Sequence, residues 1–310
     1  MHLKAVTNLL LAMLCISIMD TMIKMLSGGY ALHQLVFIRA VISLVILLPV
    51  LFRHGIMAMH TRRPGAHIFR GLLLVMANMT FFTGLASLPL AQASAVVFFA
   101  PVIITIFSFW ILKEQFGPFR WVAVLMGLVG MALIVQPFSG RIEMAYLWPL
   151  AAAFCYAGFT TMTRYIGNTE SASLLAVTAQ GSFLLVSMLM GLVVGSGQFA
   201  GHTDPGIEFI LRAWHWPASS DMIYFGAIGV LSAITALSIS YAYRSAQASF
   251  LAPFEYSNLP LVLLWGYLVF NEFPNAMALI GILLIVAGGM VVWLDSQFRK
   301  RAVISNCSPR

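Results

Sequence analysis

Long apolar stretches dominate this chain, and they constrain its fold more than any other feature of the sequence. Ten stretches of about 20 mostly apolar residues are separated by short segments that hold charges, proline, glycine or polar clusters. A helix needs about 20 such residues to cross the hydrocarbon core of a membrane. The stretches are 4–25, 33–53, 66–87, 91–113, 118–137, 145–166, 172–195, 221–243, 249–270 and 276–296. The sequence therefore predicts an all-α membrane protein with ten transmembrane helices.

The composition supports this prediction. Of the 310 residues, 61% are hydrophobic and only 9% are charged, whereas a soluble domain has about 25% charged residues. A water-soluble protein with so few charges could not cover its apolar residues with a polar surface. The first stretch, which follows Lys4, has the look of a signal peptide, but it lacks a small-x-small cleavage site before Asp20. We therefore interpret it as the first transmembrane helix.

Basic residues give the predicted helices an orientation. If both termini lie in the cytoplasm, 13 of the 17 Lys and Arg residues fall on the cytoplasmic side, three fall on the outer side, and Arg39 lies within the second stretch. Cytoplasmic loops are enriched in Lys and Arg. We therefore expect both termini to be cytoplasmic. The net charge of +7 follows from this topology and from the anionic lipids of the inner leaflet, so it gives no reason to expect a nucleic-acid partner.

A repeat divides the chain into two halves. The letters A-Q-A-S occur at 91–94 and again at 246–249. Further along, L-K-E at 112–114 corresponds to F-N-E at 270–272, at a spacing of 158 residues. Matches that keep the same order along both halves are hard to attribute to chance. We infer that the chain contains two copies of one unit.

The two copies are predicted to face opposite ways. Each half holds five of the predicted helices, and because five is odd, the second copy enters the membrane inverted. We predict a first five-helix repeat at 1–139, a second, inverted five-helix repeat at 140–298 and a basic cytoplasmic tail at 299–310. Inverted repeats are typical of secondary transporters, because such halves give outward-open and inward-open states of similar energy.

Several short motifs sharpen this reading. The pattern A-x-x-S-A-x-x-x-F-x-P at 91–101, followed by Glu114, occurs in the first half, and S-F-L-A-P-F-E-Y at 249–256 and N-E-F-P at 271–274 occur in the second. With ten helices arranged as five plus five, the chain resembles the EamA-type family of the drug/metabolite transporter superfamily over essentially its whole length. The resemblance implies a transporter that works by alternating access.

The motifs are less specific for the cargo. D-T-M-I-K at 20–24 and H-I-F-R-G-L-L-L at 67–74 resemble segments of bacterial S-adenosylmethionine uptake proteins. Bacterial riboflavin importers and amino-acid exporters resemble the chain in much the same overall pattern. A P-Y-R-Y-like segment of the S-adenosylmethionine carriers reads P-F-E-Y at 253–256, which reverses a charge. The resemblance implies that the protein lies in the inner membrane of a bacterium and that its cargo is a small organic metabolite. S-adenosylmethionine, riboflavin and an amino acid all remain open as the cargo.

Charged residues inside the predicted spans are candidates for cargo binding or ion coupling. A carboxylate such as Glu255 is costly in a membrane unless it is paired or protonated, so it could carry a proton or reach water or Arg244 at the inner face. Asp20 and Lys24 are four residues apart on one helix face, so they could pair with each other or handle cargo and protons. Arg39 could extend to the interface, meet Asp20, or meet an anionic cargo group.

Helix-breaking and aromatic residues point to the same region. Pro101, Pro253 and Pro260 interrupt corresponding helices of the two halves, and such interruptions are tolerated where they face protein or a water-filled cavity. We expect a central cavity lined by the first, third, fourth, sixth, eighth and ninth helices, with Tyr256 and Phe99 stacking on the cargo. The fifth and tenth helices would form the flank or a homodimer face.

Other residues are expected to be structural. We interpret Arg70 as an anchor at the cytoplasmic interface, Gly127 and Gly130 as sites of close helix packing, and Glu114 and Glu272 as carboxylates that suit helix N-termini.

Enzyme functions find little support in the sequence. There is no H-E-x-x-H metal motif, no phosphate-binding G-x-x-x-x-G-K-[ST] motif and no C-x-x-C pair, so we expect no metal and no cofactor. A membrane channel or scaffold without gradient coupling remains the alternative to a secondary transporter. For a transporter, proton coupling through Glu255 or Asp20 and facilitated exchange are both compatible with the sequence.

Overall fold

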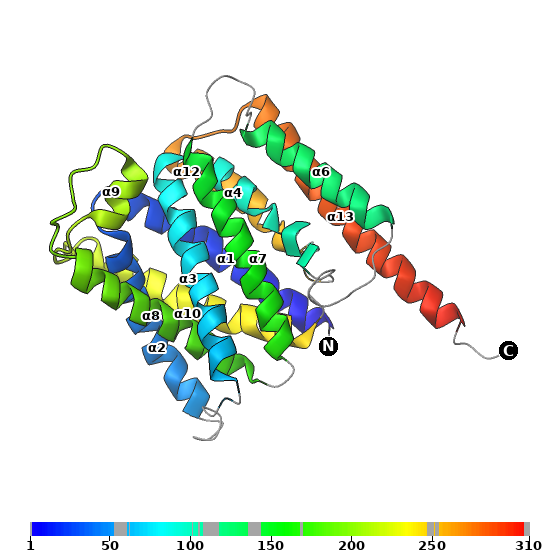
Figure 1. Ribbon diagram of the computed structural model, residues 1–310, viewed down its shortest axis with the longest axis horizontal. Helices are drawn as coiled ribbons and strands as arrows, with labels where there is room; N and C mark the ends of the chain where they lie inside the picture. The colour runs from blue at the N-terminus through cyan, green and yellow to red at the C-terminus, as the bar shows by residue number, and fades with distance from the viewer. Residues whose placement is uncertain are drawn as a thin grey trace.

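The computed structural model shows a bundle of helices packed side by side (Figure 1). It describes residues 2–52, 61, 63–100, 102–104, 106–107, 118–135, 144–167, 170–246, 251 and 254–306. Within these ranges the regular structure is entirely helical. The helices are α1 (His2–Leu26), α2 (Leu32–Phe52), α3 (Pro64–Ser87), α4 (Leu90–Val97), α6 (Pro118–Val135), η2 (Met144–Tyr146), α7 (Leu147–Gly167), α8 (Ala172–Val194), α9 (Pro205–Leu211), α10 (Met222–Ser245), α12 (Asn258–Phe270) and α13 (Ala276–Asn306).

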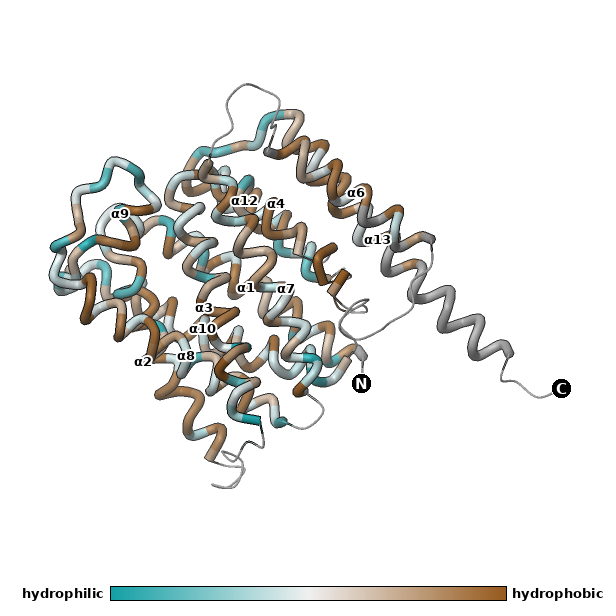
Figure 2. Tube along the Cα trace, viewed as in Figure 1, coloured by the Kyte–Doolittle hydropathy of each residue, from teal (hydrophilic) through white to brown (hydrophobic). Residues whose placement is uncertain are grey.

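The long helices have the properties of membrane spans. Five of them, namely α1, α2, α3, α8 and α10, are long and apolar enough to cross a membrane, and α12 and parts of α6 and α13 are shorter apolar helices. Large apolar side chains such as Val45, Leu125 and Leu192 are more than 60% exposed, as expected for residues that face lipid. Figure 2 shows hydrophobic residues along most of α2 and α6, and hydrophilic residues in the loop around α9. The chain is a multi-pass membrane protein.

One short helix was not predicted. The long connection at 196–220 contains α9, which begins at Pro205. The Asp204 side chain accepts a hydrogen bond of 2.9 Å from the Ile207 N–H, and proline follows at the first helical position. An aspartate cap and an N-terminal proline together favour a helix start, even in a loop.

Hydrogen bonds show how the helices run. At one end of the bundle, which we call the Tyr30 end, Tyr30 donates to Asp221 just before α10 at 2.7 Å. At the same end Lys24, in the last turn of α1, donates to the carbonyl oxygen of Leu88 just before α4. Tyr146, just before α7, bonds to α4. Thus α1 ends where α7 begins, and these two corresponding helices run in opposite directions.

The opposite end of the bundle, which we call the Glu170 end, is joined in the same way. Thr61 donates to Glu170 at 2.9 Å, and the Arg63 guanidinium lies 5.3 Å from the centroid of the Tyr165 ring. These contacts bring the start of α3 to the end of α7 and the start of α8.

The helices of the first half pack mainly against helices of the second half. Helix α1 packs against α10, and its counterpart α7 packs against α3; α2 packs against α8, α4 against α12 and α6 against α13. The α6–α13 pair lies at one edge of the bundle (Figure 1). A Cβ added at Gly130 of α6 would lie 2.7 Å from the carbonyl oxygen of Gly281 in α13, so only glycine permits this close approach. The packing role expected for Gly130 is confirmed.

Two of the predicted helices are interrupted. Helix α4 ends at Val97 and is followed by a turn at 98–99, while Phe254 and Glu255 are helical and a turn at 256–257 separates them from α12. The turns stand 158 residues apart, the spacing that also aligns 112–114 with 270–272. Pro101 and Pro253 lie outside the described residues. Pro260, which was expected to break a helix, instead lies in the first turn of α12, where a backbone N–H has no helical partner to lose.

Candidate functional site

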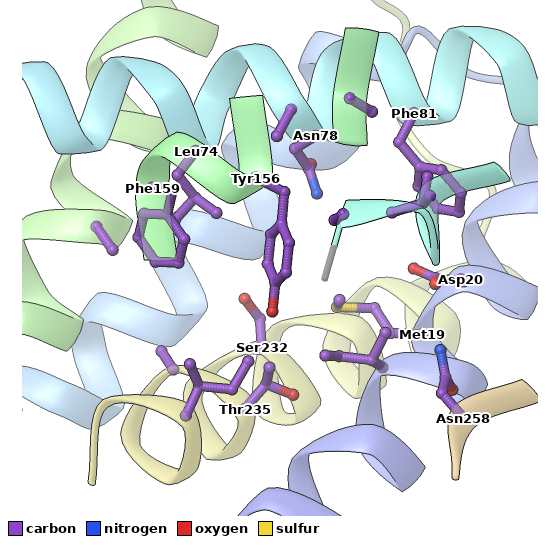
Figure 3. Close-up of a pocket in the computed structure, with 18 of the residues that line it drawn as sticks. Met19, Asp20, Leu74, Asn78, Phe81, Tyr156, Phe159, Ser232, Thr235 and Asn258 are labelled. Carbon is purple, nitrogen blue, oxygen red and sulfur yellow. The ribbon is translucent and has the colours of Figure 1, made fainter. Parts of the chain in front are cut away.

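A cavity lies between the two halves (Figure 3) and has a volume of about 210 Å³. Its lining residues come from α1, α2, α3, α4, α7, α8, α10 and α12 and from Phe98, Ala100 and Glu255, and none belongs to the described parts of α6 and α13. The structure thus brings together the helices that were expected to line a cavity. It adds α2 and α8, whose residues Arg39, Gln180 and Phe183 reach the cavity wall.

Among the described residues, four charged side chains line this cavity. Asp20, Arg39, Arg70 and Glu255 are each at most 5% exposed. In the part of the chain that the structure describes, none of the four lies within 4.0 Å of an oppositely charged side chain. Burying a charge without a partner is energetically costly, so such residues are candidates for a functional role. The two acids and two bases balance each other in the part of the wall that the structure describes.

Glu255 is held by two tyrosines. Its Oε1 accepts hydrogen bonds from the hydroxyl of Tyr156 in α7, at 3.0 Å, and from the hydroxyl of Tyr243 in α10. The carboxyl group lies beside the turn at 256–257 that precedes α12, and Tyr156 stands in the middle of the cavity (Figure 3). Glu255 is thus turned inward to the tyrosines rather than outward to Arg244.

Asp20 and Arg39 face the same cavity near the Tyr30 end. Arg39 donates from Nη2 to Asn78 Oδ1 at 2.8 Å, and its guanidinium lies 4.7 Å from the centroid of the Phe183 ring. Arg39 therefore points inward and does not extend to the interface. The Asp20 carboxylate accepts no hydrogen bond from the described residues, and Figure 3 shows it pointing into the cavity. The Asp20 carboxylate could therefore accept a hydrogen bond from a molecule in the cavity.

Lys24 differs from its predicted role. Its Nζ lies 2.7 Å from Glu272 Oε2 and 3.1 Å from the Leu88 carbonyl oxygen, and it does not line the cavity. The long lysine side chain extends past the end of α1, where Glu272 neutralises it, so no pair with Asp20 forms. Glu272 also accepts from the Leu90 N–H at 3.0 Å. It serves a helix N-terminus, as expected, but that of α4 in the other half. Glu114 lies outside the described residues.

The two aromatic residues favoured by the sequence lie behind the cavity wall. Tyr256 and Phe99 are buried, and neither lines the cavity. Both belong to the interrupting turns, at 98–99 and 256–257. The aromatic residues that do line it are Phe81, Phe98, Tyr156, Phe159 and Phe183.

Arg70 is the main residue that sequence reasoning missed. It was expected at the cytoplasmic interface, but it is 1% exposed and lines the cavity. Its burial is possible because Nε donates to Thr163 Oγ1 at 2.8 Å and Nη1 donates to the Leu175 carbonyl oxygen at 3.1 Å. The amides Asn78, Gln180 and Asn258 also line the cavity. Amide side chains inside apolar stretches were the available signal for them.

Comparisons with known proteins find relatives over most of the chain. The model of the EamA-like transporter family matches the chain twice, over residues 3–136 and 143–294. A riboflavin transporter of Vibrio cholerae is 31% identical, over 79% of this chain and 77% of that protein. A second riboflavin transporter, from Rhizobium johnstonii, is 30% identical over 82% of this chain and 78% of its own length.

A third relative and a solved structure cover more of the chain. An S-adenosylmethionine uptake transporter of Rickettsia prowazekii is 24% identical over 94% of this chain and 92% of its own length. A protein crystal structure superposes with a TM-score of 0.64 and 19% identity, covering 96% of this chain and 97% of that one. At this level of identity the crystal structure shows a shared fold.

Proposed function

The chain belongs to the EamA-like transporter family, and from that premise we propose that it is a secondary transporter that moves a small organic metabolite across a bacterial inner membrane by alternating access. A family of transporters, with relatives named as transporters, makes the chain a transport protein rather than an enzyme. The observation that carries the proposal is the cavity, which both halves line and which holds four buried charges that have no ion-pair partner among the described residues.

The proposed topology has ten spans in two inverted five-helix repeats, at 1–139 and 140–298, with both termini cytoplasmic. Two observations support it: α1 and α7 run in opposite directions, and the helices of each half pack mainly against helices of the other half. In this topology the Tyr30 end is the outer end and the Glu170 end is the cytoplasmic end. The segment 299–310, whose first residues continue α13, is the cytoplasmic tail.

The cargo we propose to test first is riboflavin, followed by S-adenosylmethionine. Both names come from relatives, and both compounds carry a ring system that suits the aromatic side chains of the cavity wall. The wall carries both acidic and basic side chains, which suits a neutral or zwitterionic cargo. A cargo with a large net charge would be repelled by the wall residues of the same sign.

The test uses bacteria that cannot make riboflavin and that produce this chain. We expect labelled riboflavin or labelled S-adenosylmethionine to accumulate in them, and accumulation above the outside concentration would require a coupled gradient. Preloading with unlabelled cargo should speed uptake, as carriers exchange cargo and channels do not. No uptake of either compound at normal membrane abundance would contradict the proposed cargoes, and uptake without any effect of preloading would favour a channel.

Proton coupling is proposed to run through Glu255. A buried carboxyl group held by two hydroxyls can lose and regain a proton as the cavity opens to either side. Glu255→Gln should abolish accumulation against a gradient, and Asp20→Asn should reduce it. Glu208→Gln, which makes the same change outside the cavity, is the control and should leave uptake unchanged. Unaltered accumulation in Glu255→Gln would remove this role.

A further inference from the structure

Arg70 is fixed in the cavity wall by contacts from two helices. Nε donates to Thr163 of α7, and Nη1 donates to the Leu175 carbonyl oxygen and, at 3.5 Å, to Thr178, both in α8. The guanidinium lies 4.8 Å from the centroid of the Phe159 ring, a distance typical of a cation–π contact. With these contacts the side chain has one orientation and little freedom to leave the wall.

The positive charge of Arg70 has no counter-ion among the described residues. The nearby Glu170 is engaged by Thr61, at 2.9 Å, and by His67, at 3.7 Å. The hydrogen bonds of Arg70 use Nε and Nη1, whereas Nη2 has no partner in the part of the chain that the structure describes. A guanidinium that is 1% exposed and lacks a counter-ion strongly favours an anion in the space beside it.

We propose that Arg70 binds a carboxylate group of the transported metabolite. This inference rests on the proposed function and narrows its cargo. A guanidinium N–H fits a carboxylate oxygen in charge and geometry. A doubly charged phosphate fits less well, because Asp20 and Glu255 on the same wall would repel it.

The carboxylate site lies away from Asp20. Phe159, on which Arg70 stacks, and Asp20 stand at opposite sides of the cavity in Figure 3, with Tyr156 between them. A metabolite with a ring, a donor group for Asp20 and a carboxylate for Arg70 would occupy the length of the cavity. S-adenosylmethionine has an amino-acid arm with a carboxylate, and riboflavin has no carboxylate. Of the two proposed cargoes, Arg70 therefore favours S-adenosylmethionine.

The test compares two ligands that differ only in the carboxylate. Binding of S-adenosylmethionine and of decarboxylated S-adenosylmethionine is measured with the purified full-length chain. We expect the carboxylated compound to bind at least about tenfold more tightly to the wild-type chain, because a charge-assisted hydrogen bond is lost with its carboxylate. Arg70→Gln should remove this preference, and Arg70→Lys, which keeps the charge, should retain part of it.

Arg63→Gln is the matched control. Arg63 is the N-cap residue of α3, and its guanidinium also stacks on an aromatic ring of α7, that of Tyr165, but it does not line the cavity. This variant should keep the wild-type preference. If Arg70→Gln weakened both ligands equally, or if the wild-type chain did not distinguish them, the carboxylate role would be overturned.

Two further outcomes separate this inference from the proposed function. A wild-type chain that binds and transports riboflavin but neither adenosyl compound would overturn the carboxylate assignment and leave the proposed transport intact. A well-folded wild-type chain that binds none of the three compounds would overturn the proposed cargo classes, and the carboxylate assignment with them.

Discussion

The rings of Phe98 and Tyr256 pack against each other, with centroids 5.7 Å apart and planes inclined by 38°. Each residue belongs to a turn that interrupts a helix, one in the first half and one in the second. Phe98 lines the cavity, and Glu255 precedes Tyr256 directly. The two interruptions therefore meet at one aromatic contact beside the candidate coupling carboxylate.

This contact should appear as an energetic coupling between the halves. We expect the double-mutant cycle of Phe98→Leu and Tyr256→Leu to give a coupling of about 0.5–1.5 kcal/mol in the free energy of unfolding, the range for aromatic pairs. Unfolding is measured in detergent. The control is Tyr267 and Phe273, whose ring centroids are 6.5 Å apart and whose side chains are exposed. It should give a smaller coupling; equal values in the two cycles would contradict the prediction.

The sequence was sufficient to place most of the helices, because each apolar stretch must satisfy its backbone hydrogen bonds internally. It also singled out Asp20, Arg39 and Glu255, since a charge in an apolar stretch is costly wherever the helix packs. It could not place Arg70, because the partners that make its burial possible, Thr163 and Leu175, are distant in the sequence. Such burial depends on which helices meet, and local pattern does not encode that.

Lys24 is a second residue whose partner could not be predicted from the local sequence. Spacing alone suggested Asp20 as its partner, whereas the actual partner, Glu272, is 248 residues away. The side chain of Lys24 is long enough to reach more than one acid. It pairs with Glu272 because the α12–α13 connection, which contains Glu272, lies next to the end of α1. Because this connection belongs to the other half, the ion pair joins the two halves at the Tyr30 end.

The Lys24–Glu272 pair should stabilise the packing of the halves. A double-mutant cycle of Lys24→Met and Glu272→Gln should show a coupling of about 1 kcal/mol in the free energy of unfolding, which decreases at high salt. The pair formed by Glu208 of α9 and Arg212, the residue that follows α9, is the control, because its N–O distance is 3.8 Å rather than 2.7 Å. Its coupling should be smaller. A Lys24–Glu272 coupling near zero at low salt would show that the ion pair does not hold the halves together.

The loop before α9 should loosen in acid. The backbone N–H groups of His202 and Gly201 donate to Glu208 at 2.9 and 2.8 Å, and they lower the pKa of Glu208 below its usual value of 4.5. A lowered pKa means that the stabilisation is present above the usual pKa and is lost as the pH falls through the lowered one. Hydrogen exchange at these two amides, compared with Glu208→Gln at each pH, should be slower in the wild type at neutral pH. The difference should vanish in acid, and a constant difference at all pH values would contradict the assignment.

Removing one tyrosine hydroxyl should test how Glu255 is held. Tyr243→Phe deletes a hydrogen bond to a buried carboxyl group, and we expect it to lower the free energy of unfolding by about 1–3 kcal/mol and to reduce cargo accumulation. Tyr224→Phe is the control, because Tyr224 is on the same helix and its hydroxyl has no hydrogen-bond partner among the described residues. That control should change both quantities little. If Tyr243→Phe destabilised the chain but left accumulation unchanged, the tyrosine would serve only folding, and coupling through Glu255 would need no second hydroxyl.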